Sequence, residues 1–285
     1  MRAVRRAVPL NRGGVAGVSI VIAVMVLAVV GPAIAPYDPT AQVLRDRLLP
    51  PAWAAGGSLD HVLGTDGNGR DLLSRVLAGT QLSVAIALAA VGIGAGIGVP
   101  AGIAAGLRGG WVDMIAGRLA DVQQSIPFMV LALAVVGVLG PSLVNLVVVL
   151  GLGSWFAWYR VVRGEVLALR EQPFVEAARA VGIGDARLIT GQLWRNLVPS
   201  LIVLATLWLP QAIVYTAGLS FLGLGVPPPA PEWGRLISDG SESLARAPWV
   251  ALAPSVVLVV TVLGLTLAGD WLRDAVDPVR RGRRG

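Results

Sequence analysis

The chain has 285 residues, of which 55% are hydrophobic and only 14% are charged, and its net charge is +6. Soluble domains usually contain about 25% charged residues, so this composition indicates a protein solvated largely by a lipid bilayer. All 23 basic residues are arginine, cysteine is absent and His61 is the only histidine. This excludes a lysine-containing P-loop, thiolate metal sites and histidine clusters, and we expect no cofactor and no metal site.

Gaps without charged residues predict six membrane-spanning helices, at about 16–36, 81–106, 117–139, 142–162, 197–222 and 249–269. Each is close to the ~20 apolar residues that one crossing needs. The uncharged stretch between Asp121 and Arg160 is too long for one crossing, so Gly140-Pro141 is expected to divide it into a hairpin. Pro127 is expected to kink the third span. The predicted fold class is all-α and integral to the membrane.

The first apolar run has a second interpretation. Basic residues followed by an apolar stretch and Ala33-Ile34-Ala35 are also typical of a cleaved signal peptide. The run is longer than a usual signal-peptide core, however. Cleavage would also leave five spans and force the arginines of 159–195 outside or reverse the topology. We therefore expect a retained transmembrane helix.

The placement of arginine predicts the orientation. The N-terminal segment, 159–195 and the tail from Asp270 are rich in arginine, whereas 37–79 and 223–248 carry more acidic than basic residues. Arginine-rich loops stay in the cytoplasm, so both termini of this multi-pass protein are expected there. Because these arginines flank apolar runs, we attribute the positive charge to topology in membrane lipid and expect no nucleic-acid partner.

The second span is rich in glycine, and its glycines are Gly92, Gly94, Gly96, Gly98, Gly102 and Gly106. Glycines at i, i+4 allow helix backbones to approach closely in lipid, so tight packing is the favoured interpretation. Lining a pathway is the alternative.

The middles of the predicted spans contain no ionisable side chain. Ion-coupled carriers usually need such groups near the midplane of the membrane. The sequence therefore argues against a self-sufficient secondary transporter and indicates that energy enters from outside the membrane.

The loop between the fourth and fifth spans carries the most informative pattern. Pro173 suits the first turn of a helix over 174–181, which Gly182 would end. Small residues would let this helix enter a groove on a partner protein, while Glu176 and Arg179 offer charges. An ordinary amphipathic connector is the alternative.

Charged residues precede the second span. Arg70, Asp71 and Arg75 are predicted to pair on a short helix that follows Asp66, with contact to a partner protein as the alternative. We expect His61 to be a hydrogen-bonding loop residue rather than a ligand.

Three charged residues mark the inner end of the third span: Asp113, Arg118 and Asp121. Arg118 and Asp121 are spaced i, i+3 and are predicted to pair. We therefore expect a structural role for them rather than contact with a solute.

Several motifs in one order resemble a known family. Glu176-Ala177-Ala178 followed by Gly182 resembles the coupling loop of ATP-binding-cassette (ABC) importer permeases, which docks on an ATPase subunit. The other motifs resemble the dipeptide/oligopeptide/nickel permease family, in its C-type transmembrane subunit. The first of these motifs is 61–75, before the second span, which includes Gly64, Thr65, Asp66, Gly69, Arg70 and Asp71. The second runs from Trp111-Val112-Asp113 to Ile126-Pro127, at the start of the third span. The others are 219–225 with Pro228 and Trp233-Gly234, after the fifth span, and 269–278 near the C-terminus. The resemblance covers about residues 15–280.

The resemblance implies an ABC type I importer permease fold, with a cytoplasmic coupling helix between spans 4 and 5. It implies an N-terminal part at 1–78 (cytoplasmic N-terminus, first helix and external loop), a five-helix permease core at 79–279 and a basic cytoplasmic tail at 280–285. The implied partners are a homologous permease subunit, two ATP-binding subunits and an extracellular solute-binding protein, in a bacterial inner membrane.

The implied function is translocation of di- or oligopeptides, or of a similar small solute such as a nickel chelate. The chain would be non-catalytic, with ATP hydrolysed by the partner subunits. A stand-alone secondary transporter is the alternative. The implied ATPase-coupling residues are Glu176, Ala177, Ala178, Arg179 and Gly182, and the implied external-loop motif consists of Gly64, Thr65, Asp66, Gly69, Arg70 and Asp71.

The sequence departs from the family pattern at three places. After the coupling helix it has Gly191-Gln192-Leu193-Trp194-Arg195-Asn196, without the family's proline. Thr216 stands where a glutamate is usual, and Gln81 where an arginine is usual. These departures bear on coupling and substrate class rather than on the fold.

Overall fold

The computed structural model describes residues 12–182 and 184–276, except for seven side chains: those of Glu176, Ala178, Arg179, Asp185, Ala186, Thr190 and Gln192. Five helices are long and apolar enough to cross a membrane: α1 (Arg12–Ile34), α2 (Leu72–Arg108), α5 (Leu143–Arg170), α8 (Trp194–Phe221) and α10 (Pro248–Val276). A sixth candidate is the pair α3 (Gly110–Ser125) and α4 (Phe128–Leu139), bent by 90°.

Short elements complete the structure: α6 (Pro173–Ala180), α7 (Asp185–Leu188), the π-helix η3 (Ile189–Leu193), α9 (Trp233–Ser241) and two 3₁₀ helices, η1 (Leu44–Asp46) and η2 (Leu59–His61). In the described ranges the only β-pairing is a single bridge between Thr65 and Asp71. The predicted all-α class is confirmed.

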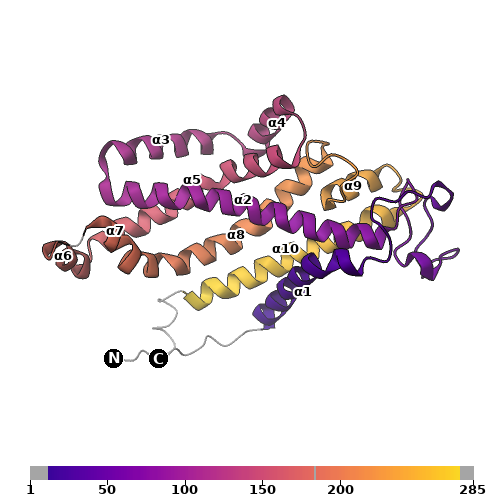
Figure 1. Cartoon of the computed structure of the whole chain (residues 1–285), viewed down its shortest axis with the longest axis horizontal. Helices are drawn as coiled ribbons and strands as arrows, with labels where there is room; N and C mark the ends of the chain where they lie inside the picture. Colours follow the sequence, from indigo (N-terminus) through magenta and orange to yellow (C-terminus); the bar gives the residue numbers. More distant parts are fainter. Residues whose placement is uncertain (1–11, 183, 277–285) are drawn as a thin grey trace.

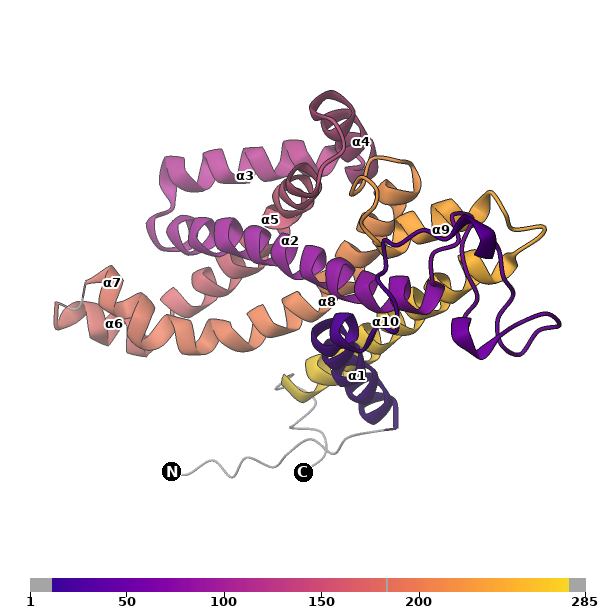
Figure 2. The ribbon, with the colours of Figure 1, turned by 45° about the vertical axis from the view of Figure 1, so that its right-hand side comes forward.

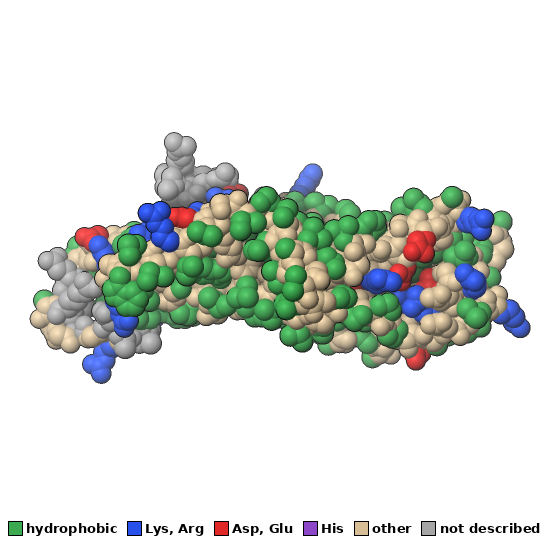
Figure 3. Space-filling model, turned by 90° about the horizontal axis from the view of Figure 1, so that it is seen from above, with side chains coloured by type: hydrophobic (Ala, Val, Ile, Leu, Met, Phe, Trp, Pro, Cys, Tyr) green, Lys and Arg blue, Asp and Glu red, His purple; other side chains and the backbone are tan. Residues whose placement is uncertain are grey.

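The long helices lie side by side along the long axis of the molecule (Figure 1). The loop of residues 35–71 and α9 lie at one end, and α6 and α7 lie at the other. A second view shows the same arrangement (Figure 2). Seen from another side, hydrophobic side chains cover the middle of the molecule, and charged side chains gather mostly toward its two ends (Figure 3). This distribution suits a protein whose middle is surrounded by lipid.

Helix α2 begins earlier than predicted. It starts at Leu72 rather than near residue 81, because the Asp71 side chain accepts a hydrogen bond from the Ser74 amide and caps the helix. Polar Thr80 and Ser83 therefore lie inside the helix, where both are buried. The polar residues at the start of the predicted span belong to a helix that continues beyond the apolar stretch.

The third predicted span is broken more sharply than the expected kink. Helix α3 ends at Ser125, and Ile126 has an extended backbone, as the residue before a proline prefers. Pro127 then precedes α4, which turns away by 90°. The proline position is confirmed as the cause of the bend, but the two halves are separate helices.

The glycines of α2 divide between two faces. Gly94, Gly98, Gly102 and Gly106 pack directly against α5, and a Cβ at any of them would lie within 2.7 Å of a Ser154, Trp155, Tyr159 or Val166 atom. Gly92 and Gly96 have no such neighbour within 4 Å. Tight packing is therefore confirmed for the α5 face only.

Candidate functional site

The predicted short helix after the fourth span is present as α6. It begins at Pro173 and ends at Ala180, and Gly182 follows with a positive φ of 79°. A proline is favourable in the first turn because its missing N–H has no partner there in any case. Glycine adopts the left-handed conformation after a helix without a steric penalty.

One side of α6 is anchored to the bundle. Val175 is fully buried in a small apolar cluster with Leu188 and Leu193. Leu107 at the end of α2 and Leu169 at the end of α5 pack on the same cluster. The short helix is thus fixed to two long helices through a single apolar contact region.

The other side of α6 is open. Phe174 is 39% exposed and Ala177 is also exposed. Val181, which directly follows the helix, is 77% exposed. The side chains of Glu176, Ala178 and Arg179 lie outside the described residues, although their backbone forms part of α6. The helix therefore presents a small, partly apolar surface at this end of the molecule.

Arg170 ties α5 to α2 beside this surface. Its Nη1 donates a hydrogen bond of 3.2 Å to the carbonyl oxygen of Gly106, and its Nε lies 2.9 Å from the Glu171 carboxylate. A displacement of the α5 end therefore also acts on α2.

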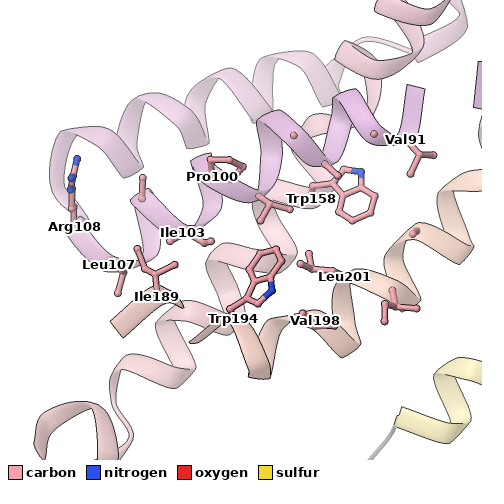
Figure 4. A pocket seen from close by; sticks show the side chains of 17 residues that line it. Val91, Pro100, Ile103, Leu107, Arg108, Trp158, Ile189, Trp194, Val198 and Leu201 are labelled. Atoms are coloured by element: carbon pink, nitrogen blue, oxygen red, sulfur yellow. The ribbon is translucent and has the colours of Figure 1, made fainter. Parts of the chain in front are cut away.

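A large apolar cavity of about 850 Å³ lies between α2 and α8, directly above the α6 cluster. Leu107 and Ile189 belong to both the cluster and the cavity wall. Trp158 and Trp194 reach toward it from different helices, with Arg108 at one edge (Figure 4). Gly92 and Gly96, where a Cβ would have no neighbour within 4 Å, line the cavity from α2. The residues of the cavity wall are 91, 92, 95, 96, 99, 100, 103, 104, 107, 108, 158, 189, 194, 198, 201, 202 and 205.

At the opposite end, the structure brings the external-loop motif together as a buried charged cluster. Asp66 is 3% exposed, and its carboxylate accepts a hydrogen bond of 2.7 Å from Arg70 Nε. Arg75 Nε lies 3.4 Å from the same carboxylate. Asp239 of α9 adds a second carboxylate 3.6 Å from Arg70 and 3.9 Å from Arg75. The cluster joins the loop of residues 35–71 to α2 and α9.

The expected pairing of Arg70, Asp71 and Arg75 with one another is wrong. Both arginines pair with Asp66, because Asp71 instead caps α2 and accepts a hydrogen bond of 2.9 Å from His61. His61 is thus a hydrogen-bonding loop residue, as predicted.

The remaining motif residues shape the loop. Gly64 and Gly69 have positive φ values of 78° and 73°, which glycine adopts most easily. The Thr65 hydroxyl accepts a hydrogen bond of 2.8 Å from the Leu49 amide and donates one to the Asp46 carbonyl. Together these contacts fold residues 46–71 onto themselves.

Sequence reasoning missed two acidic residues at this end. Glu232 is 1% exposed and caps α9 by accepting hydrogen bonds from the Gly234 and Arg235 amides. Ser83 of α2 lies 3.3 Å from the same carboxylate. Asp239 was equally unmarked, although its i, i+4 spacing from Arg235 is a usable helical signal. The contact between Ser83 and Glu232 was not predictable, because the two residues lie far apart along the chain.

Another polar cluster joins α3 to α5. The Arg163 guanidinium makes two hydrogen bonds to the Asp113 carboxylate, and the Tyr159 hydroxyl lies 3.1 Å from it. Arg160 pairs with Asp121.

The predicted Arg118–Asp121 pair is therefore wrong. Asp121 pairs with Arg160 across the helix interface instead of with its neighbour along α3. Within the described part of the chain, Arg118 has no ion-pair partner.

The architecture is that of an all-helical, multi-pass membrane protein with an exposed short helix at one end. The family described as "Binding-protein-dependent transport system inner membrane component" matches residues 98–282. The "N-terminal TM domain of oligopeptide transport permease C" matches residues 4–51. The chain belongs to this family of ABC importer permeases, of the oligopeptide type.

Relatives extend over nearly the whole chain. The di/tripeptide transport system permease protein DppC of Pseudomonas aeruginosa is 39% identical over 94% of this chain and 88% of the relative. The dipeptide permease DppC of Haemophilus influenzae is 37% identical over 94% and 91%. The glutathione transport system permease protein GsiD of Escherichia coli is 40% identical over 92% and 85%.

A solved structure shows the same fold. A chain of the MetNI methionine ABC transporter, in an inward-facing conformation, superimposes with a TM-score of 0.56 and 21% identity, over 71% of this chain and 96% of that chain. The family match and the relatives show that the protein is a permease subunit of an ABC importer. The alternative of a stand-alone secondary transporter finds no support, because the family is binding-protein-dependent.

Proposed function

We propose that this permease imports di- or oligopeptides, or a similar small solute such as glutathione or a nickel chelate. The named substrates of the relatives support this choice. In this proposal a homologous permease, two ATP-binding subunits and an extracellular solute-binding protein complete the importer. ATP hydrolysis belongs to the partners, because the chain has no lysine with which to build a P-loop.

The proposed orientation places α6 and both termini in the cytoplasm and the loop of residues 35–71 outside. The arginine-rich segments support it. The proposed division is an N-terminal part at 1–78, a permease core at 79–279 and a basic tail at 280–285. Helix α2 is continuous from Leu72, so the first two parts share this helix.

The two-sided environment of α6 carries the coupling proposal. Val175 is fully buried against the ends of α2 and α5, while Phe174 and Val181 face outward. An ATP-binding subunit that binds the exposed surface of α6 would move this helix as a rigid body. The proposed coupling residues are Glu176, Ala177, Ala178, Arg179 and Gly182. The buried side would then pass this displacement to the long helices.

The external-loop motif has a bracing role in this proposal. Asp66 and Arg70 are buried and paired, so their side chains support the loop rather than present a contact surface. The loop held in this shape would face the solute-binding protein.

The test uses the complete importer in proteoliposomes. Glu176→Arg should leave ATP hydrolysis in place but abolish ATP-driven peptide uptake, because reversing the charge disrupts docking of α6. Glu242→Arg is the matched control, since Glu242 is exposed and lies near α9 at the other end. Uptake by Glu176→Arg at the wild-type rate would show that this helix is not the coupling surface.

A further inference from the structure

Helix α3 has an apolar exposed face. Its residues recur at spacings of four, four and three and range from 47% to 70% exposed: Trp111, Ile115, Leu119 and Val122. These spacings place them on one side of an α-helix. This side suits lipid or the apolar surface of another membrane protein.

A second face of α3 is polar, with Asp113 and Gly117 half-buried and Asp121 and Gln124 exposed. Asp113, Gly117, Asp121 and Gln124 also follow helical spacing, but on a different side. Two of these residues meet α5: Asp113 contacts Tyr159 and Arg163, and Asp121 pairs with Arg160. Between the two helices lies a polar hollow of about 550 Å³, lined by 113, 114, 117, 118, 121, 159, 160 and 163.

The ion pairs of this hollow are open to the surroundings. The Asp121 side chain is 59% exposed and that of Arg160 is 43% exposed. Both lie on helices that are candidates for membrane spans. The sequence places these residues toward the cytoplasmic ends of their helices, and partly exposed charges there rarely face lipid. The polar face of α3 is therefore expected to meet water.

The larger cavity is a poor candidate for a hydrophilic solute. Arg108 is its only charged lining residue, and the rest of its wall is almost entirely apolar. A peptide carries a carboxylate and an ammonium group, and leaving these unpaired in an apolar site is costly. Of these two spaces, only the hollow between α3 and α5 offers both signs of charge.

The charges of the hollow do not balance. Asp113 pairs with Arg163 and Asp121 pairs with Arg160. Arg118 is exposed and has no ion-pair partner in the described ranges. A guanidinium group binds a carboxylate through two parallel hydrogen bonds. The hollow thus has one excess cation suited to an anionic group of a ligand.

We propose that the polar face of α3, together with Arg160 of α5, forms a water-lined wall of the solute pathway, and that Arg118 binds the carboxylate of the passing solute. This inference rests on the proposed import of peptides and deepens it. The apolar face of α3 points away from the pathway.

The absence of cysteine allows a clean labelling test. Single substitutions Gln124→Cys on the polar face and Leu119→Cys on the apolar face are made in the complete importer, in inside-out vesicles. A charged, membrane-impermeant thiol reagent should label position 124 at least about ten-fold faster, because the reactive thiolate forms readily only in water. Equal rates at the two positions, or slow labelling at both, would overturn the water-lined wall.

A second measurement tests Arg118 itself. Arg118→Gln should lower ATP-driven uptake of a peptide with a free C-terminal carboxylate at least about ten-fold, because the paired charge-assisted hydrogen bonds to the carboxylate are lost. Arg118→Lys should restore part of it, and the exposed Arg246→Gln should behave as the wild type. With a C-terminally amidated peptide, Arg118→Gln should equal the wild type. Unchanged uptake of the free peptide by Arg118→Gln would contradict the carboxylate contact.

The proposed import of peptides and the proposed pathway wall can be disproved independently. If the wild-type importer takes up no peptide, the proposed substrate class is wrong, while the labelling contrast still decides whether the wall is wet. If the wild type imports peptide but the labelling contrast is missing, only the pathway assignment is wrong.

Discussion

Gly98 of α2 lies directly against the backbone of Trp155 of α5, and a Cβ at position 98 would come within 2.3 Å of the Trp155 carbonyl oxygen. Gly98→Ala is therefore expected to push the two helices apart. Because a backbone atom cannot move aside as a side chain does, we expect a loss of about 1–3 kcal/mol in stability. Thermal unfolding of the purified protein in detergent measures this.

Gly92→Ala is the matched control for this substitution. It lies on the same helix, but a Cβ there meets no atom within 4 Å, and alanine is the better helix former. Its melting temperature should equal or exceed that of the wild type. Equal destabilisation by both substitutions would mean that α2 and α5 do not make a close backbone contact at Gly98.

Asp66 supports two buried arginines, so its neutralisation should be costly. Asp66→Asn would leave Arg70 and Arg75 with only the more distant Asp239 carboxylate. Breaking a buried ion pair from one side typically costs about 3–5 kcal/mol. We expect a large fall in melting temperature. Asp60→Asn, at an exposed aspartate of the same loop, should have little effect.

The pairing of Asp121 with Arg160 can be tested by exchanging charges. Asp121→Arg alone should destabilise α3, because it places like charges together. Adding Arg160→Asp should restore stability, whereas adding Arg118→Asp should restore less. A double-mutant cycle on thermal unfolding gives both coupling energies. A larger coupling to Arg118 would favour the i, i+3 pairing expected from the sequence.

The buried anchor of α6 predicts a difference between two valines. Val175→Ala removes apolar volume from a fully buried site, at a cost of about 1–3 kcal/mol. Val181→Ala, at a 77% exposed site, should cost almost nothing. In the assembled importer, Val175→Ala should also reduce the uptake obtained per ATP hydrolysed. Identical coupling ratios for the two variants would show that the anchor does not transmit the motion.

Much of the architecture was predictable because the bilayer responds to local composition. Gaps without charged residues located each long helix. The positions of proline and glycine predicted the start of α6 to within one residue of Pro173. Pro127 likewise marked the bend of the third span. These features depend on neighbouring residues along the chain, so the sequence contains the needed information.

Charge pairing was less predictable than helix position. The sequence suggested near neighbours such as Arg118 and Asp121, but the structure pairs Asp121 with Arg160 and Asp113 with Arg163. These partners are 39 and 50 residues apart. Spacing along one helix cannot show which side chain of a second helix comes closer.

The sequence by itself determined that this is an all-helical membrane protein with a short helix after the fourth span and without a lysine-containing P-loop, because hydropathy, helix-start and helix-stop residues and missing residue types are local properties. Only the tertiary structure decided which glycines of α2 face α5, which acid holds Arg70 and Arg75, and where α3 exposes charge. These depend on the rotation and offset of one helix against another, which packing of the whole bundle sets.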